Sequence, residues 1–468
     1  MNPPDPAQDA RLVMLRAAAL ADAGGTLAAP GAVLVRLGFD PDHPHAGELL
    51  AAGDPGTVAA HEAAARALTV DLPRAVLLPA LVNAHTHLDL THVGPRPVDP
   101  DDPDGFVTWI GMVRRNRATT EPDISASVRA GAALSLAGGV VAVGDIAGAA
   151  RGRPTLAPWR ALEKSGLTGV SFIEFFALGP GARGVPAQVR ALIEDAHGGG
   201  AAPVRAGLQP HAPYTVSPAA LIRAAELARD GGPGLSVHLA ESAPEHRLIA
   251  RGDGPLRAML IDLGVWSEQD QAAVGHGQSP VAHAHRALAT APFLAAHVND
   301  ASEADIALLA STGTTVAYCP RASEYFGAAR VFGPHRYRDM LAAGVRVCLG
   351  TDSVINLPAA SSDPERDGLS TLDEARLLVR RDGVDPRLAL GMATTAGAAA
   401  LGLDPDRFRL AGSERGAKPV AGLVAVEIAG PARAAGHGAL GAVMASDSRP
   451  VLLTPGRLLG RTVSCRRE

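Results

Sequence analysis

The chain has 468 residues, of which 47% are hydrophobic and 19% charged, and its formal net charge is −5. That length fits a large barrel with an accessory domain, and the apolar content is enough for a sizeable core. The acidic balance and the 3% aromatic content argue against a nucleic-acid-binding protein, which needs a basic patch and stacking side chains.

The sequence predicts a soluble, cytoplasmic protein. Its first nine residues lack the basic region and apolar run of a signal peptide. No stretch approaches the ~18 uninterrupted apolar residues of a membrane span. Cys319, Cys348 and Cys465 form no disulfide framework and no Cys-x-x-Cys metal pair, which fits a reduced compartment. We therefore expect a small-molecule substrate and neither a nucleic-acid nor a membrane partner.

In chain order, residues 1 to about 75 are expected to be largely irregular, with one strand at Val33–Leu37. The Asp-, Pro- and Gly-rich stretch at 40–54 is expected to be a loop in which His43 and His45 are solvated. From residue 76 onward, short apolar runs alternate with helix-like segments. The eight runs are Val76–His87, Val140–Ile146, Val170–Ala177, Val204–His211, Leu235–Leu239, Phe293–Val298, Thr314–Cys319 and Val345–Gly350. Helices are expected between them, at Ile124–Ala137, Pro218–Arg229, Glu303–Leu309 and Tyr337–Ala343.

Eight strand–helix repeats predict an α/β fold, a (β/α)₈ barrel of the TIM type, over residues 76–404. An open parallel sheet would give the same alternation and is the alternative. After about residue 404 the helical rhythm stops, and Leu423–Ile428 and Val451–Leu453 are expected to be strands. Residues 1–75 and 405–468 are therefore predicted to form one small β domain.

The strongest local signal is His85-Thr86-His87, at the end of the first apolar run. Residues i and i+2 of a strand point to the same side, so both imidazoles can face one metal ion. Barrel active sites lie at the carboxyl ends of the strands. The fifth run places His238 at that end, and the eighth run is followed there by Asp352. Three imidazoles and one carboxylate suit one Zn²⁺ or Fe²⁺ ion with a position left for water.

Three further polar residues fall at the same rim: His211 after the fourth run, Glu241 three residues beyond His238, and His297 in the sixth run. Water activated by a metal needs a group that carries its proton to the leaving group, and Glu241 is the candidate. The alternative for Glu241 is a carboxylate that favours a helix N-terminus. The alternative for His297 is a buried core histidine.

These segments resemble the amidohydrolase superfamily. Within it they look like the branch of triazine hydrolases, cytosine and guanine deaminases, and S-adenosylhomocysteine and aminofutalosine deaminases. The resemblance covers roughly residues 76 to 400, and its segments occur in the family's order. They are PALVNAHTHLDL, QPHAPYTVS, SVHLAESAPEH, LAAHVND, VAYCPRASEYFG and VCLGTDS.

The resemblance implies a distorted (β/α)₈ barrel with a β-sandwich made from both termini. It also implies a role for each candidate residue. The metal ligands would be His85, His87, His238 and Asp352, with Asp352 also acting as a base; Glu241 would be the proton shuttle, His297 the histidine beside the activated water, His211 a substrate contact as in the nucleoside deaminases, and Arg321 a residue of the substrate pocket.

Related members hold two metals bridged by a carboxylated lysine on the fourth strand. The fourth run here offers Gln209 and no lysine. The chain has only two lysines: Lys164 precedes the third run, and Lys418 lies past the barrel. We therefore expect one divalent metal ion per chain, zinc in first place and iron as the alternative. The chain departs from the family at Gly422, where an aspartate is usual.

The predicted function is hydrolysis of a carbon–nitrogen bond other than a peptide bond. We expect a deaminase that releases ammonia from an aminopurine nucleoside-like or amino-heterocyclic substrate. An amidase or a triazine or chloro-hydrolase of the same fold is one alternative, and a non-catalytic barrel that only binds its ligand is another. Large barrels of this kind often pair, so a homodimer is expected by analogy alone.

Overall fold

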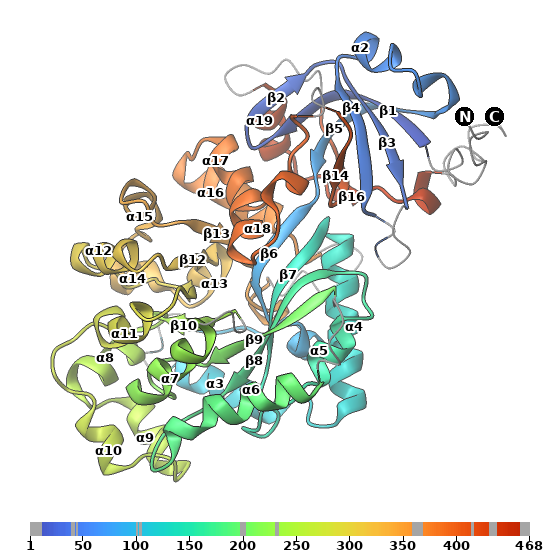
Figure 1. The fold of residues 1–468 in the computed structure, drawn as a ribbon. Helices are drawn as coiled ribbons and strands as arrows, with labels where there is room; N and C mark the ends of the chain where they lie inside the picture. The colour runs from blue at the N-terminus through green and yellow to red at the C-terminus, as the bar shows by residue number, and fades with distance from the viewer. Residues whose placement is uncertain are drawn as a thin grey trace. The chain divides into compact units, whose positions relative to one another are not determined.

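The computed structural model describes residues 12–38, 43, 45–99, 102, 105–196, 203–229, 234–357, 368–412, 416–429 and 438–458. Its described residues divide into two compact units (Figure 1). The first unit takes in residues 12–82, 134–142 and 368–458, and the second takes in residues 83–133 and 143–357. The domain limits expected from the sequence, after residues 75 and 404, stay predictions.

The first unit is built on an eight-stranded sheet with the order β14-β4-β3-β1-β5-β15-β16, and β2 pairs with β1. Strand β1 lies antiparallel to β3 and parallel to β5. Both ends of the chain contribute strands to this sheet. Its strands are β1 (Leu12–Asp22), β2 (Gly25–Ala28), β3 (Gly31–Leu37), β4 (Gly47–Gly53), β5 (Leu68–Pro79), β14 (Lys418–Val420), β15 (Leu423–Glu427) and β16 (Pro450–Leu452).

The expectation that residues 1–75 are largely irregular is wrong, because five strands lie there among the described residues. The sheet is covered on both faces, so β1 is apolar almost throughout instead of alternating. Val13 and Leu15 pack into one core cluster, whereas Leu12 and Met14 pack into another. Alanine-rich runs such as RAAALAD have low β propensity, which hid the strand from sequence patterns.

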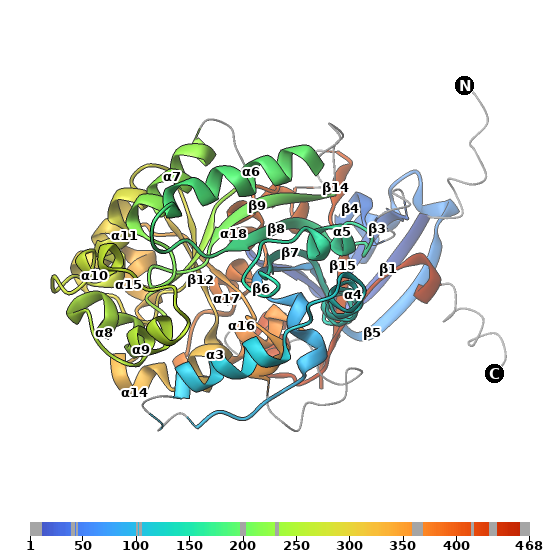
Figure 2. The same cartoon turned by 90° about the horizontal axis from the view of Figure 1, so that it is seen from below.

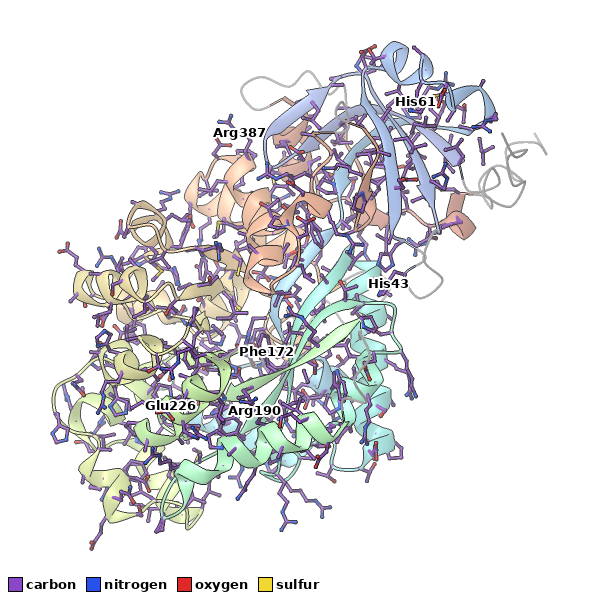
Figure 3. All side chains as sticks on the ribbon, viewed as in Figure 1. His43, His61, Phe172, Arg190, Glu226 and Arg387 are labelled. Carbon is purple, nitrogen blue, oxygen red and sulfur yellow. The ribbon has the colours of Figure 1, made fainter. Side chains whose placement is uncertain are left out.

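Two smaller features of the first unit also differ from expectation. His45 is only 3% exposed, so it is not a solvated loop residue, and its ring lies 6.0 Å from that of His43, which Figure 3 labels. The unit also contains helices that cover its sheet or follow the barrel segment. These are α2 (Pro55–Ala59), η1 (Ala64–Arg66), α16 (Thr371–Asp382), α17 (Pro386–Met392), α18 (Thr395–Ala400), η6 (Pro405–Phe408) and α19 (Gly438–Ala445).

The second unit carries the eight strands expected from the apolar runs, arranged in chain order as two four-stranded sheets, β6-β7-β8-β9 and β10-β11-β12-β13. Parallel bridges join Leu208 to Leu235, beside β10, and Thr86 to Asp352, beside β13. The two sheets are thus linked at both ends, in the order that a (β/α)₈ barrel requires. The strands are β6 (Leu81–Thr86), β7 (Val140–Ala147), β8 (Thr168–Phe175), β9 (Val204–Pro210), β10 (Ser236–Leu239), β11 (Leu294–His297), β12 (Thr315–Tyr318) and β13 (Val347–Leu349).

One expected strand is divided. The first apolar run, Val76–His87, breaks at Ala80: its first half ends β5 of the terminal sheet, and its second half is β6. Before the break, the backbone belongs to the terminal sheet, where Leu78 pairs with Val424 of β15. This single apolar run therefore supplies the end of β5 to the terminal sheet and the whole of β6 to the barrel.

The helices of the second unit follow its strands. In Figure 2, α6 and α7 lie along the outer side of β8 and β9. Phe172 of β8, labelled in Figure 3, packs so tightly over β9 that a Cβ at Gly207 would lie 2.5 Å from its Cδ1 atom. The helices are η2 (Leu88–Val93), α3 (Gly105–Asn116), α4 (Glu121–Ala137), α5 (Ala157–Leu162), η3 (Ala182–Gly184), α6 (Val185–Ala196), α7 (Pro218–Arg229), α8 (Ala243–Arg251), α9 (Pro255–Asp262), α10 (Glu268–Ala272), α11 (Pro280–Leu288), α12 (Glu303–Ser311), α13 (Pro320–Tyr325), α14 (Ala328–Phe332), α15 (Tyr337–Ala342) and η4 (Val354–Asn356).

All four helices expected from the sequence are present, as parts of α4, α7, α12 and α15. Helix α12 begins with a capping box, in which Ser302 and Asp305 each bond the other's backbone N–H. Among the described residues, no helix combines the length and the apolar character needed to cross a bilayer.

Candidate metal centre

Four residues expected to bind a metal converge at one end of the strands. His85 lies in β6, His87 follows that strand, His238 lies in β10, and Asp352 follows β13. The Nε2 atoms of His87 and His238 are 3.2 Å apart. Asp352 Oδ1 lies 3.5 Å from Nε2 of His87 and 3.8 Å from Nε2 of His85. The structure therefore brings three imidazoles and one carboxylate around one point.

The chemistry of this donor set fits a divalent metal ion. Both ring nitrogens of His85, and Nδ1 of His87, are buried without a hydrogen-bond partner among the described residues. Burial, and next the neighbouring His238, hold the pKa of each of these two rings well below the usual value. Neutral imidazoles with free lone pairs are metal ligands, and without a metal such buried nitrogens would be costly.

The backbone ties the first and last strands of the barrel together beneath the ligands. The N–H of His87 donates to the carbonyl of Asp352, and the N–H of Asp352 donates to the carbonyl of His85. Asp352 has a φ of 57°, in the left-handed region that non-glycine residues seldom adopt outside functional sites. At Gly350 a Cβ would lie 2.8 Å from the Cβ of His85, so only glycine allows this approach.

Hydrogen bonds also orient the side chains of two candidate ligands, His238 and Asp352. His238 Nδ1 lies 3.0 Å from the carbonyl oxygen of His211. A proton on Nδ1 donates to that carbonyl and leaves Nε2 free to bind a metal, as outer hydrogen bonds of metal-binding histidines commonly do. The Asn356 amide donates a short hydrogen bond to Oδ2 of Asp352, which leaves Oδ1 facing the histidines.

Glu241 and His297 lie beside the four ligands. Glu241 Oε1 is 3.6 Å from Nε2 of His297, and both side chains are buried. The rings of His297 and His238 stack with centroids 5.5 Å apart. Burial, and next the nearby Asp352, raise the pKa of Glu241 well above its usual value. A carboxyl group whose neutral form is favoured by burial therefore stands next to the cluster of donor atoms.

A second carboxylate holds the turn that carries Glu241. Glu245 is fully buried and accepts hydrogen bonds from the backbone N–H groups of Ala240, at 3.1 Å, and of Glu241, at 2.7 Å. Ala240 has a φ of 51°, so this turn is strained. Asn299 adds a third contact, because its amide donates to the carbonyl of Glu241 at 2.9 Å.

A buried charge cluster flanks the histidines on the side of β7 and β8. The Arg117 guanidinium donates to Glu174 at 3.0 Å and lies 3.6 Å from Asp89. Asp145 accepts from the backbone N–H of Leu88, directly after His87, at 3.0 Å. Burial, and then the neighbouring Asp89, raise the pKa of Asp145 to about 7. This carboxyl group therefore anchors the backbone that carries a candidate ligand.

The two expected substrate contacts lie on different segments. His211 follows β9, and its ring lies tilted against that of His238 with the centroids 5.0 Å apart, so the structure brings it to the cluster. Arg321 is the second residue of α13, which begins two residues after β12. The roles expected for both residues stay predictions.

Sequence patterns missed several residues of this site, namely Asp89, Arg117, Asp145, Glu174, Glu245, Asn299 and Asn356. Two of them carried a signal that could have been used. Asp145 and Glu174 are carboxylates inside otherwise apolar runs, close to the strand ends where functional residues gather. Arg117 and Asn356 lie in segments outside the runs, so nothing in the linear pattern connects them to the histidines.

Comparison with known proteins agrees with this architecture. The sequence model described as the Amidohydrolase family matches residues 76–406. The 5-methylthioadenosine/S-adenosylhomocysteine deaminase of Moorella thermoacetica is 31% identical over 349 residues, which cover 72% of this chain and 71% of that protein.

Solved structures show the same fold. The aminofutalosine deaminase of Helicobacter pylori superposes with a TM-score of 0.70 at 20% identity, over 95% of this chain and 99% of that one. An atrazine chlorohydrolase from Arthrobacter aurescens, complexed with zinc, superposes with a TM-score of 0.61 at 19% identity, over 97% and 99% of the two chains.

Proposed function

Because this chain belongs to the amidohydrolase family, we propose that it is a metal-dependent deaminase that hydrolyses an aminopurine nucleoside and releases ammonia. The name of the Moorella thermoacetica relative, a deaminase of two adenosine derivatives, supports this choice of reaction and substrate class. The observation that carries the proposal is the convergence of His85, His87, His238 and Asp352, with Glu241 beside them.

We propose zinc as the metal, with iron as the alternative. Three imidazole nitrogens and one carboxylate oxygen form a donor set that suits zinc and leaves a place for water. Zinc is also the ion in the related atrazine chlorohydrolase structure. A divalent ion held by these residues supplies Lewis-acid chemistry, which lowers the pKa of a water molecule toward ~7.

The proposed roles of the other residues follow from their positions. The water oxygen adds to the ring carbon that bears the exocyclic amine, with Asp352 placed to take the first proton. Glu241, whose burial raises its pKa and favours the protonated form, donates a proton to the adjacent ring nitrogen and then carries one to the amine. The carbon–nitrogen bond breaks, ammonia leaves and a carbonyl remains. His297 stays neutral and lies within reach of Glu241, so it can hold the water by a hydrogen bond.

The substrate class is tested by ammonia release from a panel of six compounds: adenosine, S-adenosylhomocysteine, aminofutalosine, cytosine, guanine and melamine. We expect ammonia from one or more of the three nucleosides and none from melamine. Ammonia from melamine alone would move the assignment to triazine hydrolysis. A protein that binds metal but releases ammonia from none of the six would contradict the deaminase proposal.

We also propose a small-molecule substrate, a cytoplasmic location and a homodimer. A small-molecule substrate agrees with a site made of buried side chains at strand ends. Cytoplasmic location and a homodimer rest on the sequence and on the family alone. Size-exclusion chromatography with light scattering would decide between one and two chains per particle.

A further inference from the structure

His297 occupies the centre of a strained turn at the end of β11. The N–H of Val298 donates to the carbonyl of Ala296 at 3.1 Å, and His297 between them has a φ of 72°. A hydrogen bond of this span around a left-handed residue is a γ-turn of the rare, strained form. Val298 has a φ of 51°, so the strain continues into the next residue. Such a backbone persists only where neighbouring groups hold it, and those groups therefore fix the position of the His297 ring.

A side chain from a distant segment contacts this turn directly. His335 lies between α14 and α15, and its Nε2 atom is 2.8 Å from the carbonyl oxygen of His297. The backbone N–H of Tyr337 donates to Nδ1 of the same ring at 3.0 Å. Because Nδ1 accepts that bond, the ring proton is on Nε2, and Nε2 donates to the His297 carbonyl.

Stacking fixes the plane of the His335 ring. Tyr318, the last residue of β12, is almost fully buried and stacks on this ring with centroids 3.7 Å apart and planes inclined by 18°. Tyr318 also stacks on Tyr337, with centroids 5.5 Å apart. The His335 ring is thus held by stacking on one side and by a hydrogen bond at each nitrogen. Since both nitrogens are engaged with the backbone, this ring is placed to hold the turn and not to bind a substrate or a metal ion.

We propose that His335 is a positioning residue, whose hydrogen bond to the His297 carbonyl holds the γ-turn and so keeps the His297 imidazole facing Glu241. This inference rests on the proposed function, in which His297 holds the water. The ring has little freedom to move, because its Nε2 atom lies 3.6 Å from Oε1 of Glu241. A displacement of ~1 Å in a reacting group can lower the rate by ~10²-fold. Loss of the His335 donor should therefore slow the reaction through His297.

The first experiment is a double-mutant cycle on ammonia release by the metal-loaded protein. His335→Phe keeps a flat ring for the Tyr318 stack but removes the donor, whereas His335→Gln keeps an amide N–H at the end of a side chain of similar length. His297→Ala and the double variant His297→Ala/His335→Phe complete the cycle. His276→Phe is the matched control, because Nε2 of the exposed His276 lies 3.0 Å from the carbonyl oxygen of Ala272 and the variant loses a bond of the same kind.

We expect kcat of His335→Phe to fall about 10- to 100-fold while KM stays within about twofold. His335→Gln should recover most of that loss, and His276→Phe should match the wild type. In the His297→Ala background, His335→Phe should have no further effect, because the group that it positions is absent. An equal fall in both backgrounds, or no fall in either, would overturn the inference.

A second experiment does not depend on turnover and separates this inference from the proposed function. Hydrogen–deuterium exchange at the Val298 amide reports whether the γ-turn is held. This amide should exchange faster in His335→Phe than in the wild type, and His276→Phe should leave its exchange unchanged. Unchanged exchange in His335→Phe would overturn the inference even if kcat falls. Faster exchange in a protein that releases no ammonia from any nucleoside would support the hold of His335 on the turn and remove the deaminase assignment.

A shorter side chain keeps the inference testable if His335→Phe does not fold. His335→Asn carries the same amide as His335→Gln on a side chain one methylene shorter, so it should not reach the His297 carbonyl. We then expect His335→Asn to lose the turnover that His335→Gln keeps, and to exchange the Val298 amide faster. Equal turnover and equal exchange in these two variants would overturn the inference.

Discussion

The Glu241 carboxyl group faces the His297 imidazole, with Oε1 and Nε2 3.6 Å apart and both side chains almost fully buried. Burial affects the two groups in opposite directions, raising the pKa of Glu241 and lowering that of His297. Burial thus favours the neutral form of each group, which places a potential proton donor beside a potential proton acceptor. General acid–base chemistry in a closed site needs this combination.

The first prediction concerns Glu241 itself. Glu241→Gln keeps the size of the side chain but removes the transferable proton, so kcat should fall by about 10²–10⁴-fold. The metal content should not change, because Glu241 belongs to none of the groups of described side chains that lie close enough together to hold an ion. Steady-state ammonia release and elemental analysis measure the two quantities. Glu303→Gln, at an exposed position in the first turn of α12, is the matched control. Turnover close to that of the wild type would remove Glu241 from the reaction.

The second prediction concerns the carboxylate that holds the Glu241 turn. In Glu245→Gln a side-chain NH₂ group replaces one of the two carboxylate oxygens, so one of the two backbone N–H groups faces another donor. We expect this unpaired N–H group to cost about 1–3 kcal/mol of unfolding free energy. Because the turn then loses its fixed geometry, kcat should fall while KM stays within about twofold. Urea denaturation and steady-state kinetics provide both numbers. A Glu245→Ala variant with unchanged kcat would show that the turn holds its shape without this residue.

The third prediction tests the close approach of β13 to β6. Gly350→Ala places a methyl group 2.8 Å from both the Cβ and the carbonyl oxygen of His85, so the strand ends must separate. Overpacking of this kind costs about 1–3 kcal/mol, and here it also displaces a ligand. We expect weaker metal binding in a chelator competition assay. Gly184→Ala, where a Cβ would meet nothing within 4 Å, is the control and should behave as the wild type. Equal metal affinity in both variants would contradict the assigned ligand geometry.

The fourth prediction concerns pH and Asp145. Its pKa is raised to about 7 in the folded protein, so between pH 4 and 7 the native state binds a proton that the unfolded state has lost. Stability from this group is therefore present at low pH and declines as pH rises toward 7. Relative to Asp145→Asn, the wild type should lose about 2–3 kcal/mol of unfolding free energy between pH 5 and 8. Parallel urea titrations at both pH values measure the difference. If the difference in unfolding free energy between the wild type and Asp145→Asn does not change with pH, Asp145 is ionised throughout this range.

Sequence patterns located the barrel strands because these strands are almost entirely buried and mostly apolar. They also located the histidines and Asp352, since residues at the ends of parallel strands meet in space. The same reasoning failed for the terminal sheet. Its strands are rich in alanine and short polar segments, and β1 and β5 pair across more than fifty residues, a register that no local pattern encodes.

The charged residues behind the histidines were out of reach for another reason. Arg117 follows α3 and Glu174 lies near the end of β8, and only the folded chain brings their side chains to 3.0 Å. Arg117 looks like an ordinary surface charge in the sequence, so nothing there pairs it with Glu174. The lysine count, by contrast, gave a prediction that needs no structure: one metal ion, because no lysine lies on the fourth barrel strand.

We propose that one metal ion held by four side chains makes this protein a deaminase. A metal titration of the activity is the most direct test of this proposal. The protein is stripped with a chelator, and ammonia release from its best nucleoside substrate is followed as zinc is added back. We predict no ammonia without metal, a linear rise with added zinc, and a plateau at about one equivalent per chain. Full activity in the stripped protein, or a plateau at two equivalents, would contradict the single-metal site.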